Sequence, residues 1–229
     1  MDATLLLGAI VGLVWGFTAD RIAARWPRHE DGSIRAIDWR TWAVVLVGGL
    51  AGALVMDRFS RIGCVDVSGC QAAVAVFVLM VLVTADLVVL FATDLDQRLL
   101  PDVLTLPIGP LALGAFALGV NPFVADPPAL AIAAAAAIVL PLGMFLLSLP
   151  FGQDAIGLGD LKLLVGIGLL GGAWRLLSGL VVGAIVAAIV ILALMAARRL
   201  TLRSYVPYGP FLILGVMWTL LVLPLDRPM

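Results

Sequence analysis

Two groups of aspartates occur in an otherwise apolar chain. The first group lies in the segment 91–107, FATDLDQRLLPDVLTLP, and contains Asp94, Asp96 and Asp102. The second lies in the segment 152–164, GQDAIGLGDLKLL, and contains Asp154 and Asp160. Two carboxyl groups that face each other share one proton, so one acts as a general base on water while the other acts as a general acid. This is the chemistry of an aspartic protease, and it requires no serine or cysteine nucleophile.

Each group also has a structural interpretation. Asp102 follows Pro101 and fits the first turn of a helix, where a carboxylate is favourable without any catalytic role. Asp160 fits the start of a helix after a glycine-rich turn, and its carboxylate would then act as an N-cap. Gly157-Leu158-Gly159 is too short for a dinucleotide fingerprint and follows no expected strand.

The composition indicates that the elements carrying these acids lie in a membrane. The chain has 229 residues, of which 63% are hydrophobic and 13% charged, with a mean hydropathy of +1.16. A soluble domain has about a quarter charged residues, so the soluble, disordered and nucleic-acid-binding classes are excluded. With one histidine (His29) and two cysteines (Cys64 and Cys70), no metal or cofactor is expected.

The apolar runs predict an all-α, polytopic membrane helix bundle of about eight transmembrane helices. We place them at 4–19, 41–56, 72–92, 103–120, 129–149, 160–173, 176–197 and 207–224. The first run lacks a preceding basic segment and a following A-x-A site, so it is expected to be a retained span and not a signal peptide. One membrane-embedded domain, 1–229, is expected, with a two-span region (1–70) and a catalytic core (71–229).

The basic residues predict the orientation. Ten of the 14 Lys and Arg residues fall in links on one side, which places both termini outside the cytoplasm and the acid groups at the inner face. Arg58, Arg61, Arg175 and Arg227 fall on the outer side. Cys64 and Cys70 share an outer link and form a disulfide if that side is oxidising.

Three motifs in this order resemble those of the type IV prepilin peptidases, membrane aspartic proteases of the GxGD class. Asp94 with Pro101-Asp102 and Thr105 resembles the first catalytic-aspartate segment, and Gly157-Leu-Gly159-Asp160-Leu-Lys162-Leu163 resembles the GxGDxKL segment. Val206-Pro-Tyr-Gly-Pro-Phe-Leu212 resembles the entry into the last helix. The resemblance implies that Asp94 and Asp160 are the catalytic pair. Asp96 competes for the first role, but its spacing to Pro101 favours Asp94.

The resemblance also implies supporting roles around this pair. Gly157 and Gly159 would let the backbone of Asp160 approach its partner, while Lys162, Asp102 and Asp154 would support the site. The implied activity is cleavage of the basic leader peptide of prepilins or pseudopilins at the cytoplasmic face of the inner membrane. Bifunctional members insert a cysteine-rich, N-methylating domain after the first span, but the segment 28–40 is short and has no cysteine, which favours a peptidase alone.

Other interpretations stay open at the level of sequence. An ion- or proton-coupled transporter also carries intramembrane acids and broken helices, although these acids cluster at one face and no two-fold repeat is visible. A non-catalytic scaffold and a relative of the signal peptide peptidases are further alternatives. Asp86, two helical turns before Asp94, fits a structural acid better than a proton relay. The sequence leaves the oligomeric state open.

Overall fold

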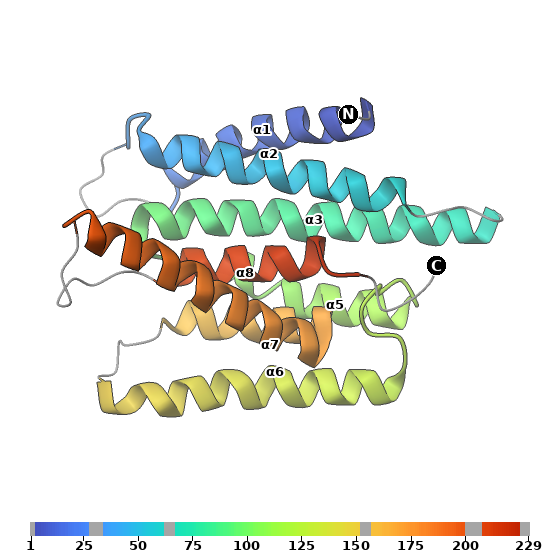
Figure 1. The fold of residues 1–229 in the computed structure, drawn as a ribbon. Coiled ribbons are helices and arrows are strands. Elements are labelled where there is room, and N and C mark those ends of the chain that lie inside the picture. The colour runs from blue at the N-terminus through green and yellow to red at the C-terminus, as the bar shows by residue number, and fades with distance from the viewer. Residues whose placement is uncertain (1–2, 28–33, 62–66, 152–156, 200–207, 225–229) are drawn as a thin grey trace.

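A computed structural model describes residues 3–27, 34–61, 67–151, 157–199 and 208–224. The described residues form helices throughout: α1 (Ala3–Ala23), α2 (Trp39–Ser60), α3 (Val67–Gln97), α4 (Asp102–Thr105), α5 (Ile108–Ala117), α6 (Pro127–Ser148), the 3₁₀ turn η1 (Leu149–Phe151), α7 (Leu158–Ala196) and α8 (Gly209–Leu221). The predicted all-α membrane bundle is confirmed (Figure 1).

The helix α7 combines two of the predicted spans. Gly172 interrupts it with a backbone φ of 77° and ψ of 174°, a conformation that residues with a side chain rarely adopt. The chain turns back at this break, so the first half (158–171) and the second half (173–196) run in opposite directions (Figure 1). The predicted boundary between 160–173 and 176–197 therefore falls at a real reversal.

The number of membrane spans stays a prediction. With α7 counted as one helix, five of the described helices are long and apolar enough to cross a membrane. The predicted span 103–120 is divided into the short helices α4 and α5, and α8 has only 13 residues. The described helices thus follow the predicted order, while the shortest of them fall below the usual span length of about 20 residues.

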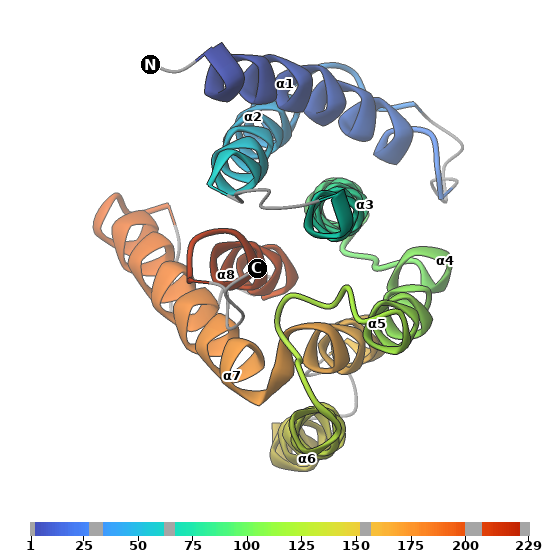
Figure 2. The same cartoon turned by 90° about the vertical axis from the view of Figure 1, so that its right-hand side faces the viewer.

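The end-on view places α8 at the centre of the bundle, with α2, α3 and both halves of α7 around it (Figure 2). Most side chains of α8 are buried, and α3 is the most buried of the long helices. The outer helices α1 and α6 expose large apolar side chains, as expected for surfaces that contact lipid. The core that positions the two aspartate groups therefore consists of α3, α7 and α8.

The arginines at the far end of α8 hold its last turn in place. Arg58 of α2 donates to the carbonyl oxygens of Leu221 (3.1 Å) and Leu223. Arg175 of α7 is 1% exposed, donates to the carbonyl oxygen of Thr219 (2.5 Å) and to that of Pro224, and stacks over the ring of Phe123. Cations at a helix C-terminus satisfy its free carbonyl groups and complement its dipole. Arg175, expected in an outer link, is thus a buried residue of the bundle.

Candidate active site

The site centres on two carboxyl groups brought together by distant segments. Asp94 lies in the last turns of α3 and Asp160 in the first turn of α7. Asp94 is 5% exposed, Asp160 is half-buried, and the two charges are close enough to interact. Within the described residues, no hydrogen bond reaches Asp94 Oδ2 or Asp160 Oδ1. These are the properties of a pair available for proton transfer.

Asp96, the competitor for the first catalytic role, has a different environment. Its side chain is 1% exposed, and its Oδ1 lies 2.7 Å from Arg35 Nε and 3.1 Å from Arg40 Nη1. Two guanidinium groups therefore neutralise this carboxylate. The structure thus separates two aspartates that are only two residues apart: Asp96 is ion-paired, and Asp94 forms no ion pair with the described residues.

Asp96 belongs to a larger ion network that joins the end of α3 to the link between α1 and α2. Arg35 also contacts the carboxylates of Asp20 and Asp38, and Asp20 is completely buried. Arg21 adds a second ion pair to Asp20 and a hydrogen bond to Thr41. Burial lowers the pKa of Arg35, but its hydrogen bond with Asp20 and the surrounding carboxylates outweigh burial and raise it above its ordinary value. The network therefore keeps Arg35 charged.

Two predicted supporting residues form a pair with each other. Lys162 Nζ lies 2.7 Å and 2.8 Å from the two carboxylate oxygens of Asp102. This partly exposed ion pair joins α4 to α7 at the rim of the site. Asp102 is the first residue of α4 and Pro101 its N-cap, so the predicted place of Asp102 in the first turn of a helix is confirmed. Whether the pair contributes to activity stays a prediction.

The two glycines before Asp160 differ in how much space their surroundings leave for a side chain. A Cβ atom on Gly159 would lie 2.7 Å from Leu100 Cβ, so this glycine lets α7 approach the connection between α3 and α4. A Cβ on Gly157 would lie 3.4 Å from Asp160 Oδ2, an ordinary contact. Asp160 is the third residue of α7 and Gly157 is the N-cap, so the alternative of an aspartate N-cap is wrong. Asp154 lies outside the described residues.

The start of α8 completes the site, and the sequence assigned it no role. A Cβ on Gly209 would lie 2.2 Å from Asp94 Oδ2, so α8 begins directly against this carboxylate. The neighbouring Tyr208 donates its hydroxyl to the carbonyl oxygen of Leu180 (3.2 Å). Tyr208 is half-buried and lies close enough to Asp160 for the two groups to interact electrostatically. The available signal was the motif 206–212, but only the fold brings it to the carboxylates.

Other features lie outside this pair. Asp86, in the middle of α3, is half-buried, and its Oδ2 has no hydrogen-bond partner among the described residues, so its role stays open. A cavity of about 590 Å³ lies between α1, α2 and α3 and is lined mostly by apolar groups, including Gly12, Trp15 and Phe77. It is not lined by either carboxylate of the pair. The disulfide prediction involves Cys64, which is outside the described residues.

Known proteins are similar in sequence to this chain. The sequence model of the type IV leader peptidase family matches residues 80–194, which include both carboxylates. A "Prepilin leader peptidase/N-methyltransferase" of Pseudomonas aeruginosa is 34% identical over 134 residues, covering 58% of this chain and 45% of the relative. A protein of the same name from Pseudomonas putida is 33% identical over 152 residues, covering 64% of this chain and 51% of the relative.

The matched region is only part of these relatives. The chain spans about half the length of the curated relatives it matches. No solved structure matches the chain significantly. The family match covers half of the chain and contains the segments around Asp94 and Asp160 that define the site. The chain therefore belongs to the type IV leader peptidase family.

Proposed function

We propose that the chain is a membrane aspartic endopeptidase whose catalytic pair is Asp94 and Asp160. The observation that carries this proposal is that Asp94 and Asp160, from distant segments, lie close enough for their charges to interact and have no ion-pair partner among the described residues. Membership of the type IV leader peptidase family supports the same activity. The region 1–70 and the core 71–229 act as one domain, and the ion pair between Arg35 and Asp96 supports this unity.

The mechanism uses one shared proton. The ionised carboxylate removes a proton from water while the water oxygen bonds to the peptide carbonyl carbon, and the protonated carboxyl gives its proton to the carbonyl oxygen. The resulting gem-diol then collapses: one of its hydroxyl protons returns to a carboxylate, the nitrogen accepts a proton from the other carboxyl, and the C–N bond breaks. The products are a carboxyl terminus and an amine, and the pair again holds one proton.

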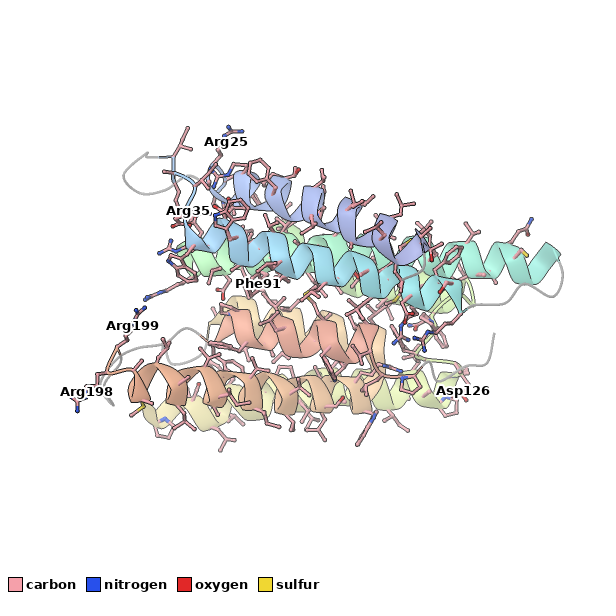
Figure 3. All side chains as sticks on the ribbon, turned by 45° about the horizontal axis from the view of Figure 1, so that its top comes forward. Arg25, Arg35, Phe91, Asp126, Arg198 and Arg199 are labelled. Carbon is pink, nitrogen blue, oxygen red and sulfur yellow. The ribbon has the colours of Figure 1, made fainter. Side chains whose placement is uncertain are left out.

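The proposed substrates are type IV prepilins or pseudopilins, and the proposed site of cleavage is the cytoplasmic face of the inner membrane. Figure 3 supports this orientation, because Arg25, Arg35, Arg198 and Arg199 lie at one end of the bundle and Asp126 at the other. Arginine-rich links remain on the cytoplasmic side. The substrate segment must unwind at the scissile bond, because a helix hides its carbonyl groups in internal hydrogen bonds.

A peptidase without methyltransferase activity is the form we propose. The matched relatives are named for both activities. The resemblance implies that a cysteine-rich domain after the first span carries methylation in bifunctional members. The link between α1 and α2 contains no cysteine. Mass spectrometry of the cleaved pilin separates the two cases, because methylation of the new N-terminus adds one methyl group.

Leader cleavage by the purified protein in detergent tests the proposal. We expect wild type to cleave a prepilin from the same cell, and Asp94→Asn and Asp160→Asn each to lower kcat by more than about 100-fold. Asp96→Asn should keep activity per folded molecule. Asp126→Asn, at the opposite end of the bundle, serves as a control. Activity of Asp94→Asn at the wild-type rate contradicts the assignment of the pair. Absence of cleavage by wild type favours the transporter or scaffold alternatives.

A further inference from the structure

Gly209, the first residue of α8, lies against the carboxyl group of Asp94, and the N-cap Tyr208 lies near Asp160. A Cβ atom on Gly209 would lie 2.2 Å from Oδ2, 2.7 Å from Cγ and 3.0 Å from Oδ1 of Asp94. Protein interiors are close-packed, and a contact below 3.0 Å forces one of the two groups to move. Gly209 is thus the residue that makes room for Asp94 in its observed position.

Tyr208 precedes Gly209 as the N-cap of α8. Its side chain is half-buried, and its hydroxyl donates to the carbonyl oxygen of Leu180 in the second half of α7 (3.2 Å). The phenol is close enough to Asp160 for the two groups to interact electrostatically. The start of α8 therefore lies beside Asp94 and near Asp160.

The rest of α8 is fixed, so the position of this first turn is fixed too. Its C-terminal carbonyl groups are held by Arg58 and Arg175. Midway along α8, a Cβ on Gly215 would lie 2.2 Å from the carbonyl oxygen of Gly179, which shows that α8 packs against α7 backbone to backbone. These contacts fix α8 both along its axis and against α7. They therefore fix the position of Gly209 beside Asp94.

We propose that Tyr208 and Gly209 are positioning residues that set the separation between the carboxyl groups of Asp94 and Asp160. The inference rests on the proposed function and adds to it a structural element outside the matched family segment 80–194. Gly209 acts by the absence of a side chain, which lets Asp94 remain beside the start of α8. Tyr208 acts by joining this turn to Leu180 of α7.

The kinetic consequence follows from the contact distances. Ordinary contact begins at 3.4 Å, so a methyl group 2.2 Å from Oδ2 displaces the Asp94 carboxylate by about 1 Å. A displacement of about 1 Å in a catalytic group lowers the rate by about 100-fold. Gly209→Ala is therefore expected to lower kcat by about 100-fold and to change KM by less than about threefold.

The pH profile gives a readout that a purely structural role would not change. The charged and titratable groups around the pair are Arg98 just after α3, Tyr208 before α8 and the Lys162–Asp102 ion pair. None of these is altered by Gly209→Ala. A changed separation between the two carboxyl groups changes their coupling, and so changes the width of the pH range in which the pair holds a single proton. A pH profile of kcat with a changed width is expected.

The test compares two glycines at close helix contacts in the same protein: Gly209, and Gly12 of α1, where a Cβ would lie 2.2 Å from the carbonyl oxygen of Gly48. Gly209→Ala should lower kcat and change the width of the pH profile, while Gly12→Ala should lower Tm and leave kcat per folded molecule and the pH profile unchanged. Tyr208→Phe, which keeps the ring and loses the bond to Leu180, should give a smaller loss of kcat. Wild-type kcat and pH profile in Gly209→Ala would overturn the inference, even though the peptidase proposal would stand.

A stability cycle tests the contact without any activity. Gly209→Ala should lower Tm in wild type and have little effect on Tm in the Asp94→Ala variant, where the clashing carboxylate is absent. An equal loss of Tm in both backgrounds would overturn the inference. If wild type cleaves no prepilin, the peptidase proposal fails, and this cycle still decides whether Gly209 positions Asp94.

Discussion

Replacing Arg35 by glutamine tests the ion network that fixes the end of α3. Arg35 is 11% exposed and contacts three carboxylates, those of Asp20, Asp38 and Asp96. Removing one partner of a buried ion pair costs about 3–5 kcal/mol, because a charge is left uncompensated. Arg21 still pairs with Asp20, and Arg40 still pairs with Asp96. The expected loss is therefore at the lower limit, about 3 kcal/mol.

The measurement is the Tm of the purified protein in detergent. In a chain of 150–250 residues, about 1 kcal/mol corresponds to about 2–4 °C, so Arg35→Gln should lower Tm by about 6–12 °C. A matched control exists in the exposed pair Arg61–Asp57, in which the arginine side chain is 75% exposed. Arg61→Gln should cost less than about 1 kcal/mol. Equal Tm values for the two variants would refute the assignment of a buried network.

A double-mutant cycle identifies the partner. Arg35→Gln combined with Asp96→Asn should destabilise the protein less than the sum of the single changes, because both members of the contact are then neutral. A coupling of about 1 kcal/mol or more is expected for groups in one network. Strict additivity would show that Arg35 stabilises the link between α1 and α2 independently of the end of α3.

Two further predictions concern the carboxyl pair and the far end of α8. Cleavage should follow a bell-shaped pH profile. Protonation of both Asp94 and Asp160 removes the general base at low pH, and ionisation of both removes the general acid at high pH. A flat profile from mildly acidic to mildly alkaline pH would contradict a shared proton. Arg175→Gln should lower Tm by several degrees, because it loses bonds to the Thr219 carbonyl and the stack on Phe123. Thermal unfolding of wild type and variant measures this loss.

Much of the bundle could be predicted from apolar runs, because a membrane span has a strong compositional signature. The order of the helices, the reversal between 160–173 and 176–197, and the position of Asp94 near the end of its helix agree with the structure. The division of 103–120 into α4 and α5 could not be predicted in this way, because Pro107 lies inside a continuous apolar run. Hydropathy records the composition of a segment and not the path of its backbone.

The parts of the site that the sequence left undefined depend on contacts between distant residues. In the sequence, only spacing favoured Asp94 over Asp96. In the structure, Asp96 differs because Arg35 and Arg40 form ion pairs with it, and these arginines lie more than 50 residues away and must fold against α3. Asp102 lies in the first turn of a helix, as predicted, but its ion pair with Lys162 depends on α4 meeting α7, which spacing does not show. Gly209 gives no local signal of its role, since only packing brings it to Asp94.

At this end of the bundle, the pattern of ion pairs supports the assignment of Asp94 and Asp160 as the proposed catalytic pair. Among the described residues there, four aspartates have basic partners within ion-pair distance: Asp20, Asp38, Asp96 and Asp102. Asp94 and Asp160 have none, although Arg98 directly follows α3 and Lys162 lies on α7. A buried carboxylate without a cation is costly to keep ionised, and a fold that neutralises its other acids gains no stability from leaving two together. Proton transfer accounts for this arrangement, because a carboxyl group held by a cation cannot also gain and lose a proton readily.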